Sequence, residues 1–372
     1  MYIFLLLLIP VSVMLAGLYF FSHKITKKEI LIQCGIGLFV VLVCKGIVLL
    51  AGYGAGIDKE YWGGYWTSFH YEEEWNEYIH KICTRQVPSG RDSRGNTIYR
   101  TETYDCSYVQ YHAAKWYGKN SNGRTLSITK QFYNTHKQNF GHKFENLRRN
   151  YHTIDGDRYN ISIPSNKIIP TVTVNSYINK TQFDSSIYKY QGVKKEQLEK
   201  YKLFEYPTPN RNHYAPSVLG SIPKPLNSKS LDKLNATLGR YKQVKVFLLF
   251  FNNQPIKAAT LQEQYWAGGN KNELVICCGL RNEKIEWTKS FSWTHSRVLV
   301  KETESKLLSM GTTKEYIDWL YNAVKDKWKR YEFKNFEYIE TPDPLWAQIT
   351  GFILICLSSG GVAYFCWKKD LV

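Results

Sequence analysis

Three long apolar runs and one large polar block make up the pattern of hydrophobic and polar positions along the chain. The runs cover residues 1–21, 30–52 and 345–367, and the block between the second and third is nearly three hundred residues long. A helix of about 20 apolar residues crosses the hydrocarbon core of a bilayer, and helix is the form in which an isolated segment satisfies its backbone amides in lipid. The pattern predicts three transmembrane helices that anchor a large polar domain.

The first run has two interpretations, a retained anchor and a cleaved signal peptide. Signal peptides carry their positive charges before the apolar stretch. Here residues 1–4 have no charged side chain, and Lys24, Lys27 and Lys28 follow the run. We therefore interpret residues 1–21 as a retained anchor, with the signal peptide as the alternative.

The lysines that flank the runs predict an orientation. The loop 22–29 and the tail 368–372 are both basic, and basic residues in short loops stay on the cytoplasmic side. Both segments reach that side only if the N-terminus lies outside. The block that starts at residue 53 is then extracytoplasmic, and the C-terminus is cytoplasmic.

One charge interrupts the second run. Lys45 lies seven residues before the outer end of the run, at Gly52. A lysine so placed can extend its ammonium group to the headgroup region, whereas a charge that stays in the membrane marks a functional site. We expect the first of these for Lys45.

The net charge constrains the partners of the external block. The chain carries a formal +17, and the membrane segments and their flanks hold six lysines and two acidic residues, which leaves +13 on the block. Such a block attracts anionic surfaces. The expected partners are membrane lipid, an anionic envelope surface or another membrane protein. No nucleic acid is expected, because no nucleic-acid motif accompanies the charge; the alternative is a charge that serves solubility alone.

Two of the eight cysteines predict a disulfide. Cys34, Cys44, Cys356 and Cys366 fall in apolar runs and Cys277-Cys278 in a strand-like run, while Cys83 and Cys106 flank a loop-forming segment. An extracytoplasmic compartment permits oxidation. We predict that Cys83 and Cys106 face each other across a hairpin and are bonded, with zinc binding as the alternative.

The first part of the external block, residues 53–225, reads as a tyrosine-rich domain of mixed helices and strands. Apolar residues at helical spacing predict a helix over 71–82, and residues 97–117 are strand-like. Thr129 precedes a predicted helix. The five prolines within 206–225 mark a linker to the second part.

The second part, residues 226–336, predicts a small α/β sandwich. Its segments alternate between amphipathic helices and continuous apolar runs of strand length, which are typical of strands buried on both faces. The fold class of the whole chain is therefore α+β with three transmembrane helices. The expected order is a helix closed by Gly239, a strand at 244–251, a helix at 256–266, strands at 273–280 and 284–293, and helices at 298–310 and from 312 on.

No motif of catalysis, metal binding or cofactor binding occurs. None of the nine histidines forms a zinc-type pair, and no nucleophile-elbow, P-loop or dinucleotide-binding signature is present. We therefore predict no catalytic residue, no metal ligand and no cofactor from the residues themselves.

Part of the second domain resembles a TPM domain. The resemblance rests on the helix at Leu231, the strand 244–251, the segment Gln262–Trp266, the turn Gly268-Gly269-Asn270-Lys271-Asn272 and the strand Leu274-Val275-Ile276. It implies a membrane-anchored extracytoplasmic domain, and it makes Asn270, Asn272 and Glu273 candidates for ligand binding. The family commonly has Asp-Asn-Gly where Lys271-Asn272-Glu273 stand. The first part contains the segments Glu60–Tyr65, Glu74–His80 and Tyr104–Tyr108. Through them it is similar to uncharacterised membrane proteins of tailed bacteriophages and bacteria, a similarity that implies no activity.

Two functions follow as expectations. The first is a membrane-anchored, basic, extracytoplasmic binding protein of the envelope that performs no catalysis. The second, which depends on the TPM resemblance, is a membrane-anchored, metal-dependent hydrolase of the phosphatase kind with its site near 268–273. We favour the first, because acidic residues are missing where the second would need them.

Overall fold

The computed structural model describes residues 2–21, 26–147, 156–190, 192–224 and 226–368. It divides into two compact units. The first unit comprises Met1–Lys59, Ser176–Lys189 and Glu332–Val372, and the second comprises Glu60–Asn175 and Tyr190–Tyr331. Helices and strands are both abundant, which confirms the mixed α+β class. The expected loop 22–29 and tail 368–372 lie in part outside the described residues.

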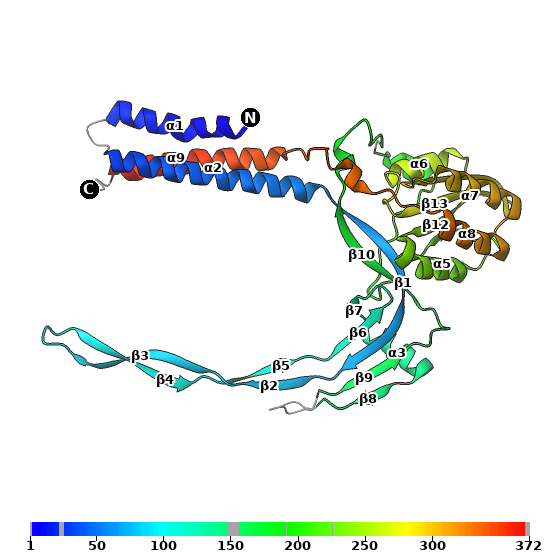
Figure 1. Ribbon diagram of the computed structural model, residues 1–372, viewed down its shortest axis with the longest axis horizontal. Helices are drawn as coiled ribbons and strands as arrows, with labels where there is room; N and C mark the ends of the chain where they lie inside the picture. The colour runs from blue at the N-terminus through cyan, green and yellow to red at the C-terminus, as the bar shows by residue number, and fades with distance from the viewer. Residues whose placement is uncertain (1, 22–25, 148–155, 191, 225, 369–372) are drawn as a thin grey trace. The chain divides into compact units, whose positions relative to one another are not determined.

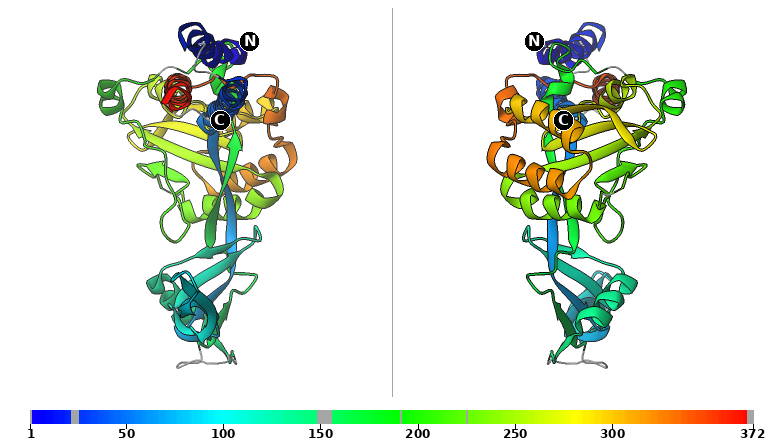
Figure 2. Two further views of the ribbon diagram at one scale, coloured as in Figure 1. Left: turned by 90° about the vertical axis from the view of Figure 1, so that its left-hand side faces the viewer. Right: turned by 90° about the vertical axis from the view of Figure 1, so that its right-hand side faces the viewer.

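The first unit is a bundle of three helices, α1 (Tyr2–Phe21), α2 (Lys27–Ala55) and α9 (Leu345–Lys368). The helices pack side by side in Figure 1 and are seen nearly end-on in Figure 2. By length and apolar composition, α2 and α9 can each cross a membrane, and the apolar stretch of α1, Leu6–Phe21, is shorter. Two short 3-10 helices, η1 (Lys180–Phe183) and η2 (Phe333–Phe336), belong to the same unit.

Small residues let the three helices approach closely. Gly37 of α2 faces Pro10 of α1, and a Cβ at Gly37 would lie 2.7 Å from the proline Cβ. Val41, Cys44 and Ile355 form the buried centre of the bundle. Close approach at small residues is the usual basis of helix packing in lipid.

The N-terminal half of the second unit is built on a six-stranded antiparallel sheet. Its order is β7-β6-β1-β9-β8, and β10 pairs with β1. The core of this part lies between one face of the sheet and the helix α3 (Lys130–Phe140), which Thr129 caps through its side chain as predicted. The strands are β1 (Ile57–Glu72), β6 (Lys115–Asn120), β7 (Thr125–Ser127), β8 (Lys143–Glu145), β9 (Arg158–Ser162) and β10 (Pro170–Ile178).

Two further ribbons connect β1 to β6. The proximal ribbon pairs β2 (Trp75–Ile79) with β5 (Tyr108–His112), and the distal ribbon pairs β3 (Ile82–Arg91) with β4 (Thr97–Asp105). We call residues 75–112, which carry both ribbons, the arm (Figure 1). The predicted helix at 71–82 is wrong, because Trp75–Ile79 is a strand. Tryptophan, tyrosine and isoleucine favour strands, and the pairing with β5 outweighs the helical spacing.

The C-terminal half of the second unit contains a four-stranded sheet of order β11-β12-β13-β14. The first three strands are parallel, and β14 is antiparallel to β13. The strands are β11 (Val218–Gly220), β12 (Lys245–Asn252), β13 (Glu273–Arg281) and β14 (Lys284–Ser292). The helices are α4 (Lys195–Lys200), α5 (Ser228–Lys242), α6 (Lys257–Tyr265), α7 (Arg297–Met310) and α8 (Lys314–Lys327).

Helices cover both faces of this sheet, so the predicted sandwich has two apolar cores. One core joins the sheet to α5, α7 and α8, and the other joins it to α6 and the segment 201–206. β12 is buried along seven of its eight residues, which suits a strand covered on both faces. The segment 206–225, expected as a linker, therefore contributes to this sandwich through Tyr206 and through β11.

Gly239 lies inside α5 and does not end it, which corrects the prediction. Glycine occurs at this helical position because the helix backbone closely contacts Gly63 of β1. A Cβ at Gly239 would lie 2.3 Å from the carbonyl oxygen of Gly63, and a Cβ at Gly63 would lie 2.2 Å from that of Asn235. Strand and helix thus meet backbone against backbone, and both positions require glycine.

Candidate functional site

The candidates Asn270, Asn272 and Glu273 lie together at the start of β13, in the turn that follows α6. The Glu273 side chain is completely buried. Its carboxylate accepts 2.9 Å hydrogen bonds from the backbone N–H and the side-chain Nδ2 of Asn270, and another from the hydroxyl of Tyr206. Burial raises the pKa of Glu273, although these hydrogen bonds oppose the rise.

These contacts give the turn a structural explanation. Glu273 closes its own turn, and Asn272 is also completely buried, with its Nδ2 donating to the carbonyl of Tyr61 at 2.9 Å. Among the described residues, no group of three or more His, Cys, Asp and Glu side chains is placed to hold a metal ion. A ligand role for the three residues stays a prediction, and the arrangement resembles an internal cap.

A buried lysine lies close to this turn. Lys245, the first residue of β12, is almost fully buried, and its Nζ donates to Ser217 Oγ at 2.8 Å. Burial lowers the pKa of Lys245 to about 8, against the attraction of Asp232 and Glu273. An amine enclosed in this way cannot contact a large substrate, so we interpret the cluster as part of the core.

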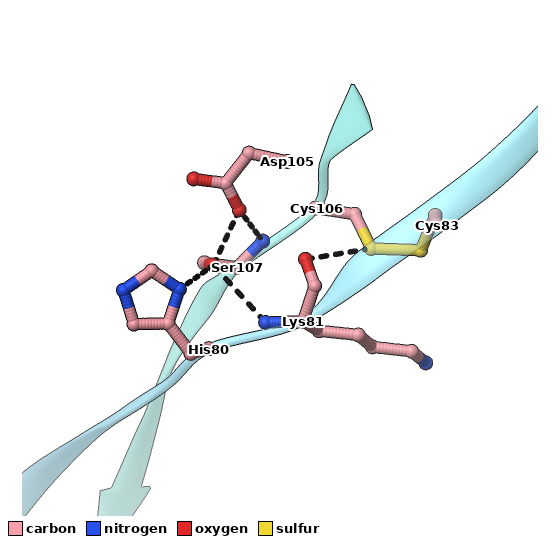
Figure 3. The surroundings of a disulfide bond; sticks show 6 residues. All are labelled: His80, Lys81, Cys83, Asp105, Cys106 and Ser107. Atoms are coloured by element: carbon pink, nitrogen blue, oxygen red, sulfur yellow. Dashed lines mark hydrogen bonds between the residues drawn. A yellow bond between two sulfur atoms is a disulfide. The ribbon is translucent and has the colours of Figure 1, made fainter. Parts of the chain in front are cut away.

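Cys83 and Cys106 lie at disulfide distance, as predicted. Their Cα atoms are 5.8 Å apart, and the pair sits where the proximal ribbon meets the distal ribbon (Figure 3). Around it, the Cys106 N–H donates to the Lys81 carbonyl at 2.9 Å, and Ser107 Oγ accepts from the Lys81 N–H at 3.1 Å. The cross-link and these hydrogen bonds join the two sides of the arm where the pairing passes from β2–β5 to β3–β4.

The proximal ribbon is held by side chains that pair across its two strands. Trp75 stacks on His112 with ring centroids 4.1 Å apart, and Glu77 lies 2.8 Å from Nε2 of the same histidine. Tyr111 donates to Glu74 at 3.0 Å. Such cross-strand pairs each stabilise a ribbon modestly, and here they stabilise one that has no apolar core of its own.

The distal ribbon exposes arginines and apolar side chains. Arg91, Arg94 and Arg100 are exposed and form no ion pair within the described part of the chain, whereas Arg85 pairs with Glu102 at 3.2 Å. Asp92 closes the turn by accepting from the backbone of Arg94 and Asn96 at 2.8 Å. Large apolar residues are exposed along both ribbons: Ile82, Ile98, Tyr99, Tyr104, Tyr108, Val109 and Tyr111.

The arm is therefore the candidate binding surface of this protein. The strands of its distal ribbon are exposed along most of their length, and arginine with tyrosine is the combination enriched where proteins contact partners. Sequence reasoning placed the cysteines correctly but did not find the arm as a whole. The sequence did contain one indication of a long hairpin. Cys83 and Cys106 are placed on either side of the turn-forming residues 88–96, and tyrosine and threonine occur near that turn.

Comparison with known proteins adds no family to this description. No protein-family model matches the chain, and neither a curated protein nor a solved structure matches it. The resemblances to TPM domains and to phage and bacterial membrane proteins thus receive no support from these comparisons. The function must be argued from the chain itself.

Proposed function

We propose that this protein is a membrane-anchored binding protein of the cell envelope, which uses its arm to bind an anionic surface. In this proposal α1, α2 and α9 all cross the membrane, the N-terminus is outside, and the second unit is extracytoplasmic. The length of α2 and α9 supports the anchoring. The lysines next to the helices support the orientation, and a cysteine pair at disulfide distance suits an oxidising compartment.

The single observation that carries the proposal is the arginine-rich end of an exposed ribbon. Arg91 ends β3 and Arg94 lies in the turn that follows, with Asp92 between them, and Arg100 lies on β4 opposite Val87. Guanidinium groups bind phosphate and carboxylate oxygens through paired hydrogen bonds. Tyr99, which is 59% exposed next to Arg100, adds an amphipathic ring that suits a headgroup layer. Phospholipid headgroups and acidic envelope polymers both offer these anions.

Binding of the full-length protein to anionic surfaces tests the proposal. The protein, reconstituted in nanodiscs of zwitterionic lipid, is mixed with vesicles that contain or lack an anionic phospholipid, and separately with an acidic polysaccharide. The test variant is Arg91→Gln/Arg94→Gln/Arg100→Gln. The matched control, Lys229→Gln/Lys233→Gln/Lys314→Gln, removes the same charge from exposed positions on α5 and α8.

We expect the arm variant to bind roughly 100-fold more weakly, since each basic residue near an anionic membrane contributes about 1 kcal/mol. The control should bind as wild type does, and added salt should weaken the wild-type binding. Equal losses in the two variants would show that total charge, not the arm, attracts the surface. Unchanged binding of the arm variant would overturn the proposal.

A further inference from the structure

Across β1, β6, β9 and β8, one face of the sheet carries charged and polar side chains together with Tyr117, and we call it the polar face. Antiparallel partners that lie opposite each other share a face, so the register of β1 with its neighbours defines its members. α3 and the apolar core cover the other face. The polar face consists of Ser68, His70 and Glu72 on β1, Lys115, Tyr117 and Lys119 on β6, Arg158, Asn160 and Ser162 on β9, and Lys143 and Glu145 on β8.

A β-bulge places Ser68 and His70 on this face. The register between β1 and β6 shifts between Trp66 and Ser68, so Thr67 is an extra residue. Trp66 and Phe69 are both fully buried on the core side. They are three positions apart, and in a regular strand residues at that spacing lie on opposite faces. Ser68 and His70 then face away from the core together. Bulges often aim side chains in this way beside active sites.

Four side chains of the polar face are linked by successive hydrogen bonds. Ser68 Oγ lies 2.8 Å from His70 Nε2, and His70 Nδ1 is hydrogen-bonded to Asn160 Oδ1. Asn160 Nδ2 in turn donates to Glu145 Oε2 at 2.8 Å. Four side chains from β1, β9 and β8 are thus linked in one direction, from hydroxyl to carboxylate.

The chemistry of these groups fixes the position of the protons. A carboxylate only accepts, so the Asn160 group that bonds to Glu145 is the NH₂, and the group that faces His70 is the carbonyl oxygen. His70 must therefore carry its proton on Nδ1. Its Nε2 is left with a free lone pair, which accepts the hydroxyl proton of Ser68. A hydroxyl bonded to a histidine that a third group orients is the arrangement of an activated nucleophile.

The surroundings of His70 keep its ring neutral and supply positive charge. Partial burial lowers the pKa of His70, and Lys119 and Arg158 lower it further, against the hydrogen bond that His70 donates to Asn160 and the charge of Glu145. Tyr117 stacks on the ring with centroids 5.0 Å apart and restrains its orientation. The histidine is then available as a base at neutral pH, and Lys119 lies opposite Ser68 in the register of β1 with β6.

We propose that Ser68, His70 and Asn160 form a nucleophilic site for carboxylic esters. Ser68 Oγ bonds to the acyl carbon while its proton passes to His70 Nε2. The carbon–oxygen bond to the leaving alcohol then breaks, and the alcohol takes that proton. Water attacks the acyl-serine, again through His70, and releases the acid. Because the face is open and basic, it suits an ester group on a large anionic molecule better than the ester of a small apolar molecule. Asn160 is a positioning residue, and the inference is independent of the binding proposed for the arm.

Labelling with a fluorophosphonate probe tests this site without knowledge of the natural ester. The probe forms a bond between serine Oγ and phosphorus and expels fluoride, and peptide mass spectrometry of the full-length protein in detergent locates it. We expect labelling at Ser68 that is lost in Ser68→Ala and retained in Ser162→Ala, the serine opposite it on β9. His70→Gln should slow labelling by about 100-fold or more. Circular dichroism verifies that each variant is folded.

Two further measurements separate catalysis from structure. Asn160→Leu should slow labelling, and Asn160→Asp, which keeps the acceptor oxygen, should restore it. The rate should fall in acid with a midpoint below the ordinary value for histidine, because His70 must be neutral. The same variants should show the same order in hydrolysis of a p-nitrophenyl ester. Labelling of Ser68 no faster than that of Ser162, or a rate indifferent to His70→Gln, would overturn the proposal and leave a structural hydrogen bond.

Discussion

Lys45 Nζ lies 3.0 Å from Asp343 Oδ2, which pairs a charge inside α2 with a residue just before α9. Each side chain is 27% exposed. Lys45 therefore has an acidic partner within the protein. From the sequence we expected its ammonium group to extend to the headgroup region without a partner. The pair joins two segments that are 298 positions apart in the chain.

Loss of one member of this pair should destabilise the bundle more than loss of both. Lys45→Leu or Asp343→Leu leaves an unpaired charge in a region of low polarity, and we expect a cost between the ~1 kcal/mol of exposed pairs and the ~3–5 kcal/mol of buried ones. The double variant should recover most of the loss. Thermal unfolding in detergent measures this, and additive losses would show that the two residues act independently.

Lys245 predicts a rise in stability with pH. Its pKa is about 8 in the folded chain and 10.5 ordinarily, so between these values the unfolded chain binds a proton that the folded chain does not. The free energy of unfolding therefore increases as the pH rises through that window, by up to about 3 kcal/mol. Denaturant unfolding at several pH values, compared with Lys245→Met, measures it. The exposed Lys301 gives the control Lys301→Met. A constant difference between wild type and Lys245→Met would contradict the prediction.

The contact between Gly63 and Gly239 predicts that neither position tolerates alanine. The added Cβ would meet backbone atoms, which cannot rotate away as a side chain can. We expect each substitution to lower the free energy of unfolding by about 1–3 kcal/mol or more. Gly192→Ala is the matched control, because no atom lies within 4 Å of its Cβ position. Thermal unfolding that ranks the three variants equally would argue against the contact.

Removal of the Cys83–Cys106 bond should loosen the arm and leave the sandwich unaffected. The bond closes a loop with a sequence separation of 23, for which loop-closure entropy gives roughly 3 kcal/mol. Cys83→Ser/Cys106→Ser should therefore raise hydrogen exchange in β3 and β4, while exchange in β12 and β13 stays as in wild type. Equal exchange in the distal ribbon of both proteins would show that cross-strand pairing alone holds it.

The orientation can be tested in whole cells with single reporter cysteines. In a background in which all eight native cysteines are replaced by serine or alanine, Ser93→Cys should react with an impermeant maleimide without lysis. Lys27→Cys, at the N-terminal end of α2, should react only after lysis. Both positions are exposed, so accessibility depends on the side of the membrane. The reverse pattern would invert the proposed topology.

The sandwich was the part most predictable from sequence, and the reason is burial. The runs at Lys245–Asn252 and Glu273–Arg281 are apolar on both faces, and their neighbouring helices have one apolar side. The arm was the least predictable part, because a ribbon exposed on both faces needs no alternation of polar and apolar residues. Around Trp75–Ile79, which is a strand, the spacing of the apolar residues even indicated a helix.

The polar face was hidden from sequence reasoning for a different reason. His70 and Asn160 are ninety positions apart and meet only through the register of β1 with β9. Ser68 and His70 share a face as any two residues at i and i+2 of a strand do, but the extra residue Thr67 decides that this face is the one away from Trp66 and the core. Nothing in the local pattern around residue 67 distinguishes a bulge from a regular strand. The candidates that resemblance did supply, Asn270 and Glu273, are instead engaged in holding their own turn.

The position of the disulfide has a consequence for the integrity of the arm when a protease is present. The turn that exposes Arg94 lies between Cys83 and Cys106, so a protease that cuts there divides the polypeptide without separating the two fragments. Both would remain covalently attached, the N-terminal fragment carrying α2 and the C-terminal fragment carrying α9. A chain nicked at the turn would therefore stay one molecule until its thiols were reduced.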